Sequence, residues 1–241
     1  FIMSKKYVMN KNLEIWEDIF QNNEWGKYPS LAVVRFVARN FYKAPNRKDI
    51  RILELGCGTG ANLWYCAREG FSVIGLDGSK TAIHRMIDRF EKENLSEFLM
   101  DTKVGDYFDT LNDIRDNSID AVIDVESLYC NRFIRTREII IKIFDKLKVG
   151  GKFLSQTFAD GTWGFENCKE NIDMLSNDYH VVFPKEGPIA NEGLGRYTTF
   201  DDINLLYKLD NNAITSTHRQ DYIYEDKKSI KEWIIESVKV K

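Results

Sequence analysis

The chain of 241 residues contains few cysteines, no long apolar run and no block of basic residues. Its four cysteines form no Cys-x-x-Cys pair, so we expect reduced thiols in a cytoplasmic protein and no metal site. The apolar runs are too short to cross a bilayer, which predicts no membrane partner. Lysines and arginines alternate with acids at a net charge of −3, which argues against nucleic acid as a partner.

The composition supports a folded protein with a sizeable core. Hydrophobic residues make up 43% of the chain and aromatic residues 13%, which argues against disorder. The length allows a single domain that carries insertions. We expect one domain with four parts: an N-terminal helical cover (1–45), a core (46–158), an insertion (159–198), and a C-terminal helix with a strand hairpin (199–241).

Strand and helix patterns alternate through the core. Two helices are predicted first, over 13–20 and 30–41. Alternation of this kind is typical of βαβ units and predicts an α/β fold with a doubly wound, mostly parallel sheet and helices on both faces. The predicted strands are 50–56, 71–77, 99–104, 119–125 and 150–158, with helices over 61–69, 80–94 and 135–147.

The pattern breaks after the fifth predicted strand. Residues 159–198 are rich in glycine and proline and show little periodicity. A segment of this length inside a compact domain is usually functional, so we expect a lid over a substrate site. Order returns with a helix over 201–207, and two strands over 213–224 and 230–240 would close the sheet as a hairpin.

The stretch ILELGCGTGANL, residues 52–63, joins the first predicted strand to a helix. Gly56, Gly58 and Ala61 fit the G-x-G-x-x-G/A fingerprint of dinucleotide-binding folds. The glycine spacing therefore predicts a nucleotide-binding loop, and it leaves the identity of the nucleotide open.

Glu54, at the end of the first strand, favours one ligand over the other. A carboxylate beside the loop repels a pyrophosphate in a partly desolvated site. It suits S-adenosylmethionine, which carries an ammonium group and a sulfonium centre. The carboxylate of that ligand would be attracted by the helix N-terminus after Gly60.

Acids also end the next two strands. Asp77 follows the loop by about twenty residues and could accept both ribose hydroxyls, in either kind of nucleotide. Asp106 could accept a hydrogen bond from the adenine amino group, and Tyr107 could stack on the ring.

The segments LELGCGTG, VIGLDGS, GDYF, DAVIDVES and LKVGGKFL, in this order, resemble motifs of class I S-adenosylmethionine-dependent methyltransferases. The closest likeness is to the small bacterial type 11 members, over residues 25–158. The resemblance implies a Rossmann-like seven-stranded sheet with an antiparallel last strand, and S-adenosylhomocysteine as a product. It also implies that cofactor is bound by Glu54, Gly56, Gly58, Gly60, Asp77, Asp106 and Tyr107.

The segment before the sheet mixes aromatic residues with a lysine and a glycine. In the resembling enzymes such a segment folds over the cofactor, so Trp25 and Tyr28 would cover the sulfonium through cation–π contacts. Simple packing of an N-terminal helix on the sheet is the alternative.

Candidates for catalysis and acceptor binding follow the fourth strand and lie in the insertion. Glu126 is the first candidate for a base or an orienting group, with contact to cofactor or backbone as the alternative. His180 is the second, because its intrinsic pKa lies near neutrality. The predicted acceptor contacts are Tyr129, Arg132 and Arg196, the arginines for an anionic group.

The leading hypothesis is a methyltransferase, monomeric or homodimeric, that acts on a small molecule. We expect O-methylation of a sugar, a sugar nucleotide or a phosphorylated metabolite, in a surface-polysaccharide or secondary biosynthetic pathway. An NAD(P)-dependent oxidoreductase is the first alternative, because Ala61 and Asp77 suit it as well. A non-catalytic cofactor-binding module is the second.

Overall fold

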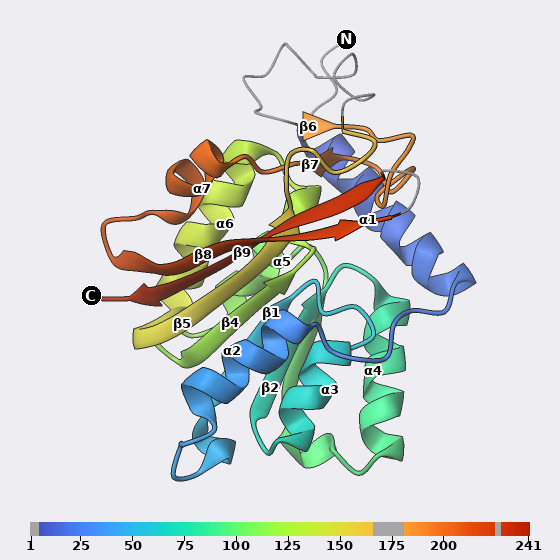
Figure 1. Cartoon of the computed structure of the whole chain (residues 1–241). Coiled ribbons are helices and arrows are strands. Elements are labelled where there is room, and N and C mark those ends of the chain that lie inside the picture. Colours follow the sequence, from blue (N-terminus) through green and yellow to red (C-terminus); the bar gives the residue numbers. More distant parts are fainter. Residues whose placement is uncertain (1–4, 166–180, 225–227) are drawn as a thin grey trace.

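The computed structural model describes residues 5–165, 181–224 and 228–241. A seven-stranded sheet forms its centre (Figure 1). In chain order its strands are β1 (Arg51–Leu55), β2 (Ser72–Asp77), β3 (Leu99–Val104), β4 (Ile119–Val125), β5 (Leu147–Phe158), β8 (Asn212–Ile223) and β9 (Ser229–Lys239). A separate small ribbon pairs β6 (Val181–Val182) with β7 (Gly195–Arg196).

The strands lie in the order β3-β2-β1-β4-β5-β9-β8. The first five run parallel, and β9 is antiparallel to both of its neighbours. This confirms the predicted doubly wound sheet with an antiparallel last strand. The chain leaves β1 toward one edge and returns at β4 toward the other. A ligand site is therefore expected beyond the carboxyl ends of β1 and β4.

Helices cover both faces of the sheet, with α2, α3 and α4 on one face and α6 and α7 on the other (Figure 1). Their bounds are α1 (Lys5–Asn22), α2 (Leu31–Phe41), α3 (Ala61–Arg68), α4 (Lys80–Lys92), α5 (Tyr107–Thr110), α6 (Phe133–Lys146) and α7 (Phe200–Tyr207). Short 3-10 turns span Arg47–Asp49, Ser96–Phe98, Leu111–Asp113 and Leu128–Cys130.

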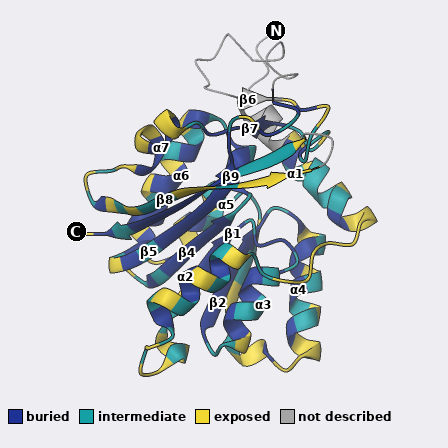
Figure 2. Cartoon of the chain, in the orientation of Figure 1, coloured by how far each residue is buried: buried dark blue, intermediate teal, exposed yellow. Residues whose placement is uncertain are grey.

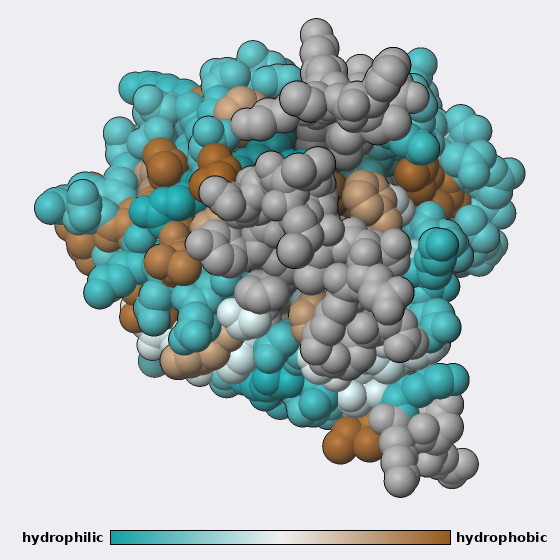
Figure 3. Space-filling model, turned by 90° about the horizontal axis from the view of Figure 1, so that it is seen from above, coloured by the Kyte–Doolittle hydropathy of each residue, from teal (hydrophilic) through white to brown (hydrophobic). Residues whose placement is uncertain are grey.

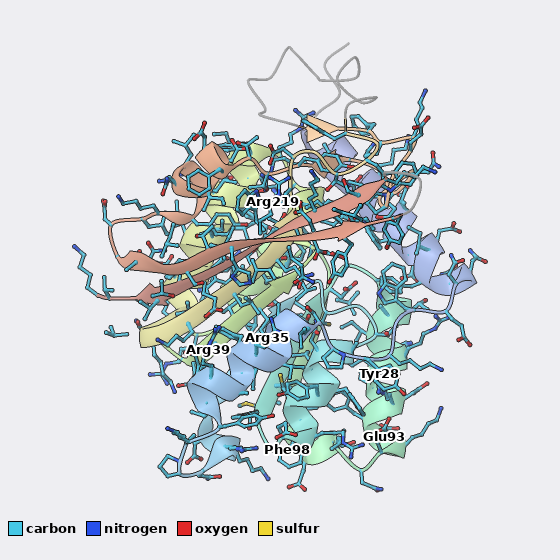
Figure 4. The ribbon with its side chains drawn as sticks, viewed as in Figure 1. Tyr28, Arg35, Arg39, Glu93, Phe98 and Arg219 are labelled. Carbon is cyan, nitrogen blue, oxygen red and sulfur yellow. The ribbon has the colours of Figure 1, made fainter. Side chains whose placement is uncertain are left out.

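The central strands are buried on both faces, which explains their nearly continuous apolar sequences. All six residues of β2 are buried, and the middle of the sheet is dark blue in Figure 2. One apolar cluster fills the space under α6 and α7, and a second lies under α2, α3 and α4. An ion pair between Arg39 and Glu236 joins α2 to β9, and Figure 4 labels Arg39 on that helix.

The predicted elements are all present, and their bounds agree with the prediction to within two residues except at the starts of α1 and β5. Helix α1 begins at Lys5, well before the predicted start at residue 13. The prediction began later because the sequence before residue 13 shows no regular apolar period. Helix α6 begins at Phe133, and β5 begins at Leu147. Leu147 ends the helix with an extended backbone and pairs with Ile119, so no loop separates the two elements.

Helix α7 begins with a reciprocal cap. The hydroxyl of Thr199 accepts from the amide of Asp202, and the Asp202 carboxylate accepts from the Thr199 amide at 2.9 Å. We expect Thr199→Ala to lower the free energy of unfolding by about 1 kcal/mol, because one amide loses its partner. Urea denaturation measures this. Thr199→Ser keeps the hydroxyl and serves as the control, and an equal loss in both variants would contradict the capping role.

Candidate functional site

A cavity of about 610 Å³ opens where the strand order reverses, at the carboxyl ends of β1, β4 and β5. Its volume is typical of a site for a small molecule or cofactor. The glycine loop after β1 and the turn after β2 form one part of its lining, and residues 125–131 after β4 form another. Further lining residues come from α1, from residues 25–31, from Asp106 and Tyr107, and from described parts of β5, of the insertion and of β8 and β9.

The glycine loop has a conformation that side chains would not tolerate. Gly56 and Gly60 have φ angles of +60° and +80°. A Cβ atom at Gly56 would lie 2.1 Å from the Ser127 hydroxyl, and one at Gly60 would lie 2.3 Å from Cγ of Met86. Gly56 therefore lets the loop approach β4 and lines the cavity, as Gly58 does. Gly60 lies behind the lining and lets α3 start close to α4.

Glu54 places a carboxylate at the cavity, 2% exposed. Its Oε1 accepts from the side-chain amide of Asn62 at 2.6 Å, whereas Oε2 has no hydrogen-bond partner among the described residues. Burial, with smaller contributions from Asp124 and Asp77, raises the pKa of Glu54 to about 8. The group is therefore mostly protonated at neutral pH until a cation approaches it.

Asp77 lines the cavity and fixes two turns. Its two carboxylate oxygens accept from the amides of Gly58 and Ser79, each at 2.7 Å. Burial raises the pKa of Asp77 to about 6. Each oxygen keeps a second lone pair with which it can accept a hydroxyl of a ligand.

Asp106 and Tyr107 also reach the cavity lining, but both have protein partners. The Asp106 carboxylate accepts from the amide of Phe108 at 2.9 Å and pairs with Arg135. The Tyr107 hydroxyl donates to the carbonyl of Ser127 at 3.0 Å and accepts from another side chain. The Asp106 carboxylate therefore also has a structural role, as the cap of α5.

Glu126 follows β4 with a φ angle of +52°, a conformation that non-glycine residues rarely adopt. Its amide donates to the carbonyl of Gln156 at 2.8 Å, which holds this backbone in place. Burial raises the pKa of Glu126 well above its usual range, and Glu232, Glu192 and Asp124 add to the effect. Strained backbone of this kind often occurs at functional sites.

Two cavity carboxylates, Glu192 and Glu232, were not predicted. Glu192 accepts from the Tyr129 hydroxyl at 2.9 Å, so the predicted acceptor contact Tyr129 is held against the insertion. Glu232 is a buried acid of β9, a strand that also carries Lys231 and Glu236, so the sequence pattern does not single it out. Glu192 lies in a segment without periodicity, and nothing in the sequence marks it.

The segment that holds Trp25 and Tyr28 lies along the cavity, and both side chains contribute to the lining. Ser30 fastens it, since its amide donates to the Asn62 side chain at 2.9 Å and its hydroxyl to the Gln156 side chain at 2.6 Å. Trp25 packs edge-on against Phe20. Figure 4 shows Tyr28 on the loop between α1 and α2, where it is 78% exposed.

Two predicted acceptor contacts are not part of the described cavity lining. Arg196 is fully buried and donates to the Thr198 hydroxyl at 2.9 Å, so its prediction as an acceptor contact is wrong. It lies in β7, where it acts electrostatically on the buried Asp124. Arg132 precedes α6 and is not part of the described lining. His180 lies outside the described residues.

Comparison with known proteins adds the family. The profile of a family described as a methyltransferase domain matches residues 46–225. A methyltransferase structure from Anabaena variabilis aligns with a TM-score of 0.67 at 16% identity, covering 96% of this chain and 95% of that chain. One from Methanosarcina mazei has a TM-score of 0.65 at 18% identity, with 80% and 93% covered. Both are described as S-adenosylmethionine-dependent. No curated protein matches the chain.

Within 5–165, 181–224 and 228–241, no helix has the length and apolar character needed to cross a membrane. On the face seen from above, hydrophobic side chains lie in small groups among hydrophilic ones (Figure 3).

Proposed function

This chain belongs to the methyltransferase domain family and is an S-adenosylmethionine-dependent enzyme, and we propose that it methylates a small molecule held beside Glu126. The observation that carries the proposal is Glu126, half-buried and with strained backbone, in a cavity continuous with the glycine loop. Membership in this family argues against the two alternatives considered from the sequence, an oxidoreductase and a non-catalytic cofactor-binding module.

The residues at the glycine loop fit this cofactor. The unpartnered Oε2 of Glu54 would accept from its ammonium group, which returns the buried carboxylate to its charged form. Asp77 would accept from the ribose hydroxyls, and Trp25 and Tyr28 would cover the sulfonium side. Asp106 and Tyr107 would border the adenine. When bound, the cofactor supplies an electrophilic methyl group.

The chain's own residues would position the acceptor and exclude water. In its charged form Glu126 would take the proton of the nucleophile, and because burial raises its pKa this carboxylate is a stronger base than an exposed one. Phe158 and Ile189 form an apolar part of the lining that would displace water from the reacting groups. Orientation then supplies much of the rate, because the nucleophile must lie in line with the bond that breaks.

The sequence favours a hydroxyl acceptor on a sugar, and Glu126 suits that chemistry. The phosphorylated and nucleotide acceptors gain less support, because the described part of the lining contains no lysine or arginine. A cytoplasmic location stays a prediction, as does a monomer or homodimer. The described cysteines Cys57, Cys66 and Cys130 are free thiols.

Transfer of a labelled methyl group tests the proposal. The protein is incubated with labelled S-adenosylmethionine and, separately, with the small-molecule, RNA and protein fractions of a cell extract. Label is expected in the small-molecule fraction, and Glu126→Gln is expected to slow its appearance about a hundredfold, the size of effect typical of a lost base. Label in the RNA or protein fraction alone would overturn the small-molecule acceptor. An unchanged rate of transfer in Glu126→Gln would contradict the proposal that Glu126 acts as the base.

A further inference from the structure

Three carboxylates from three separate elements meet in the acceptor part of the cavity. Glu126 follows β4, Glu192 precedes β7, and Glu232 belongs to β9, and we call these three the acidic wall. The Glu126 and Glu232 carboxyl groups lie close enough that Glu232 raises the pKa of Glu126. The electrostatic partners of Glu126 are all acids, namely Glu232, Glu192 and Asp124. The negative electrostatic potential at the acidic wall therefore favours a positively charged acceptor over a neutral one.

One oxygen of the acidic wall lacks a partner. Glu232 is 4% exposed, and its Oε2 has no hydrogen-bond partner among the described residues. A buried carboxylate oxygen without a partner is costly, since burial removes the water that would solvate it. A ligand that donates hydrogen bonds and carries positive charge would remove this cost. A neutral hydroxyl has one proton to donate, whereas the ammonium ion of a primary amine has three and that of a secondary amine has two.

Aromatic side chains surround the acidic wall. Tyr129, held by its hydrogen bond to Glu192, packs edge-on against Phe158 with ring centroids 5.1 Å apart. Tyr222 also lines the cavity, and its pKa is raised by burial and, to a smaller extent, by the nearby Glu232 and Glu126. Carboxylates set among aromatic rings are the usual surroundings of a bound organic cation.

We propose that the acceptor is a primary or secondary amine with an apolar body, bound as its ammonium ion against the acidic wall and methylated on nitrogen. This inference rests on the proposed function and names the acceptor class of the same site.

The reaction balances on these residues. The ammonium nitrogen first gives one proton to the Glu126 carboxylate, which frees its lone pair. The lone pair forms the new nitrogen–carbon bond as the carbon–sulfur bond breaks, and the bonding electrons stay on sulfur as a neutral thioether. The methylated nitrogen carries the remaining positive charge. The proton on Glu126 then passes to water, so each turnover releases one proton.

Calorimetry on the full chain saturated with S-adenosylhomocysteine tests the inference. The probes are matched sets of amine, alcohol and carboxylate on butyl, cyclohexylmethyl and 2-phenylethyl bodies. In the set whose body fits the cavity, we expect the amine to bind at least about tenfold more tightly than the alcohol. We expect the carboxylate of that set not to bind. With S-adenosylmethionine instead, mass spectrometry should show one added methyl group on that amine.

Glu232→Gln is expected to weaken the amine about tenfold and to leave the matched alcohol within about twofold. Glu236→Gln is the control, a carboxylate on the same strand that pairs with Arg39 outside the cavity lining, and it should change neither. The inference is overturned if the protein binds S-adenosylhomocysteine but prefers the amine in none of the three sets. The same conclusion follows if it binds S-adenosylhomocysteine but none of the probes. Preference for the alcohol restores the sugar hypothesis. Failure to bind S-adenosylhomocysteine would instead overturn the proposed function.

Discussion

Glu54→Gln is expected to raise the free energy of unfolding at pH 9 by about 3 kcal/mol and to weaken S-adenosylhomocysteine binding about tenfold. The buried carboxylate is unfavourable in the free protein, since its Oε2 lacks a partner among the described residues. Glutamine keeps the acceptor that the Asn62 amide uses and removes the charge. The same change removes the group that would hold the ligand's ammonium.

The direction of the pH effect follows from the pKa. Burial raises the pKa of Glu54 from 4.5 in the unfolded chain to about 8 in the folded one. Between these values the folded state binds more protons than the unfolded state, so stability falls as pH rises through this window. Each pH unit costs about 1.36 kcal/mol, which sets an upper limit of about 5 kcal/mol above pH 8. In Glu54→Gln the new amide N–H group takes the place of Oε2 and also lacks a hydrogen-bond partner among the described residues. Its burial lowers the expected gain in the free energy of unfolding by about 1–2 kcal/mol.

Urea denaturation at pH 5 and pH 9 separates the effect of the charge from the cost of the new amide, because Glu54 is mostly neutral in the folded protein at pH 5 and mostly charged at pH 9. Glu97→Gln is the control, an exposed carboxylate that pairs with Lys48 at 2.8 Å. Its removal should change the free energy of unfolding by less than about 0.5 kcal/mol at either pH. A Glu54→Gln gain of the same size at pH 5 and at pH 9 would mean that Glu54 does not titrate in this window.

The fold could be predicted because its signals are local. The strand β2 is a continuous apolar run that ends in Asp77, and Ser79 caps the helix after it, so both bounds lie in the sequence itself. The same holds for Thr199 at the start of α7. The part of the cavity lining formed by Glu54 and the glycine loop could be predicted for the same reason, since these residues are adjacent in the chain.

The acceptor end depends on contacts between distant segments, and sequence patterns do not record those. Glu232 comes to the cavity through the register of β9, in which it lies opposite Phe158 of β5. Arg196 was predicted to bind the acceptor because it lies between Gly195 and Tyr197 at the end of the insertion. In the structure its side chain is fully buried and donates to the Thr198 hydroxyl.

Gly60→Ala is expected to lower the free energy of unfolding by about 3 kcal/mol and to abolish measurable S-adenosylhomocysteine binding. Two costs add. The φ angle of +80° is unfavourable for any side chain, by about 1 kcal/mol. The new Cβ would also lie 2.3 Å from Cγ of Met86, whose other end packs beside Gly75, so Met86 cannot move aside freely. Overpacking of this kind costs about 1–3 kcal/mol, and relief of it would shift the glycine loop.

Gly150→Ala separates the two costs. Gly150 has the same φ angle of +80°, but a Cβ atom there meets nothing within 4 Å, so its substitution reports the backbone cost alone. Thermal unfolding should place Gly60→Ala below Gly150→Ala by about 4–8 °C, at about 2–4 °C for each kcal/mol. In a Met86→Ala background the steric cost should disappear, and Gly60→Ala should then cost no more than Gly150→Ala. Equal losses in the two single variants would show that the close approach of α3 to α4 does not require glycine.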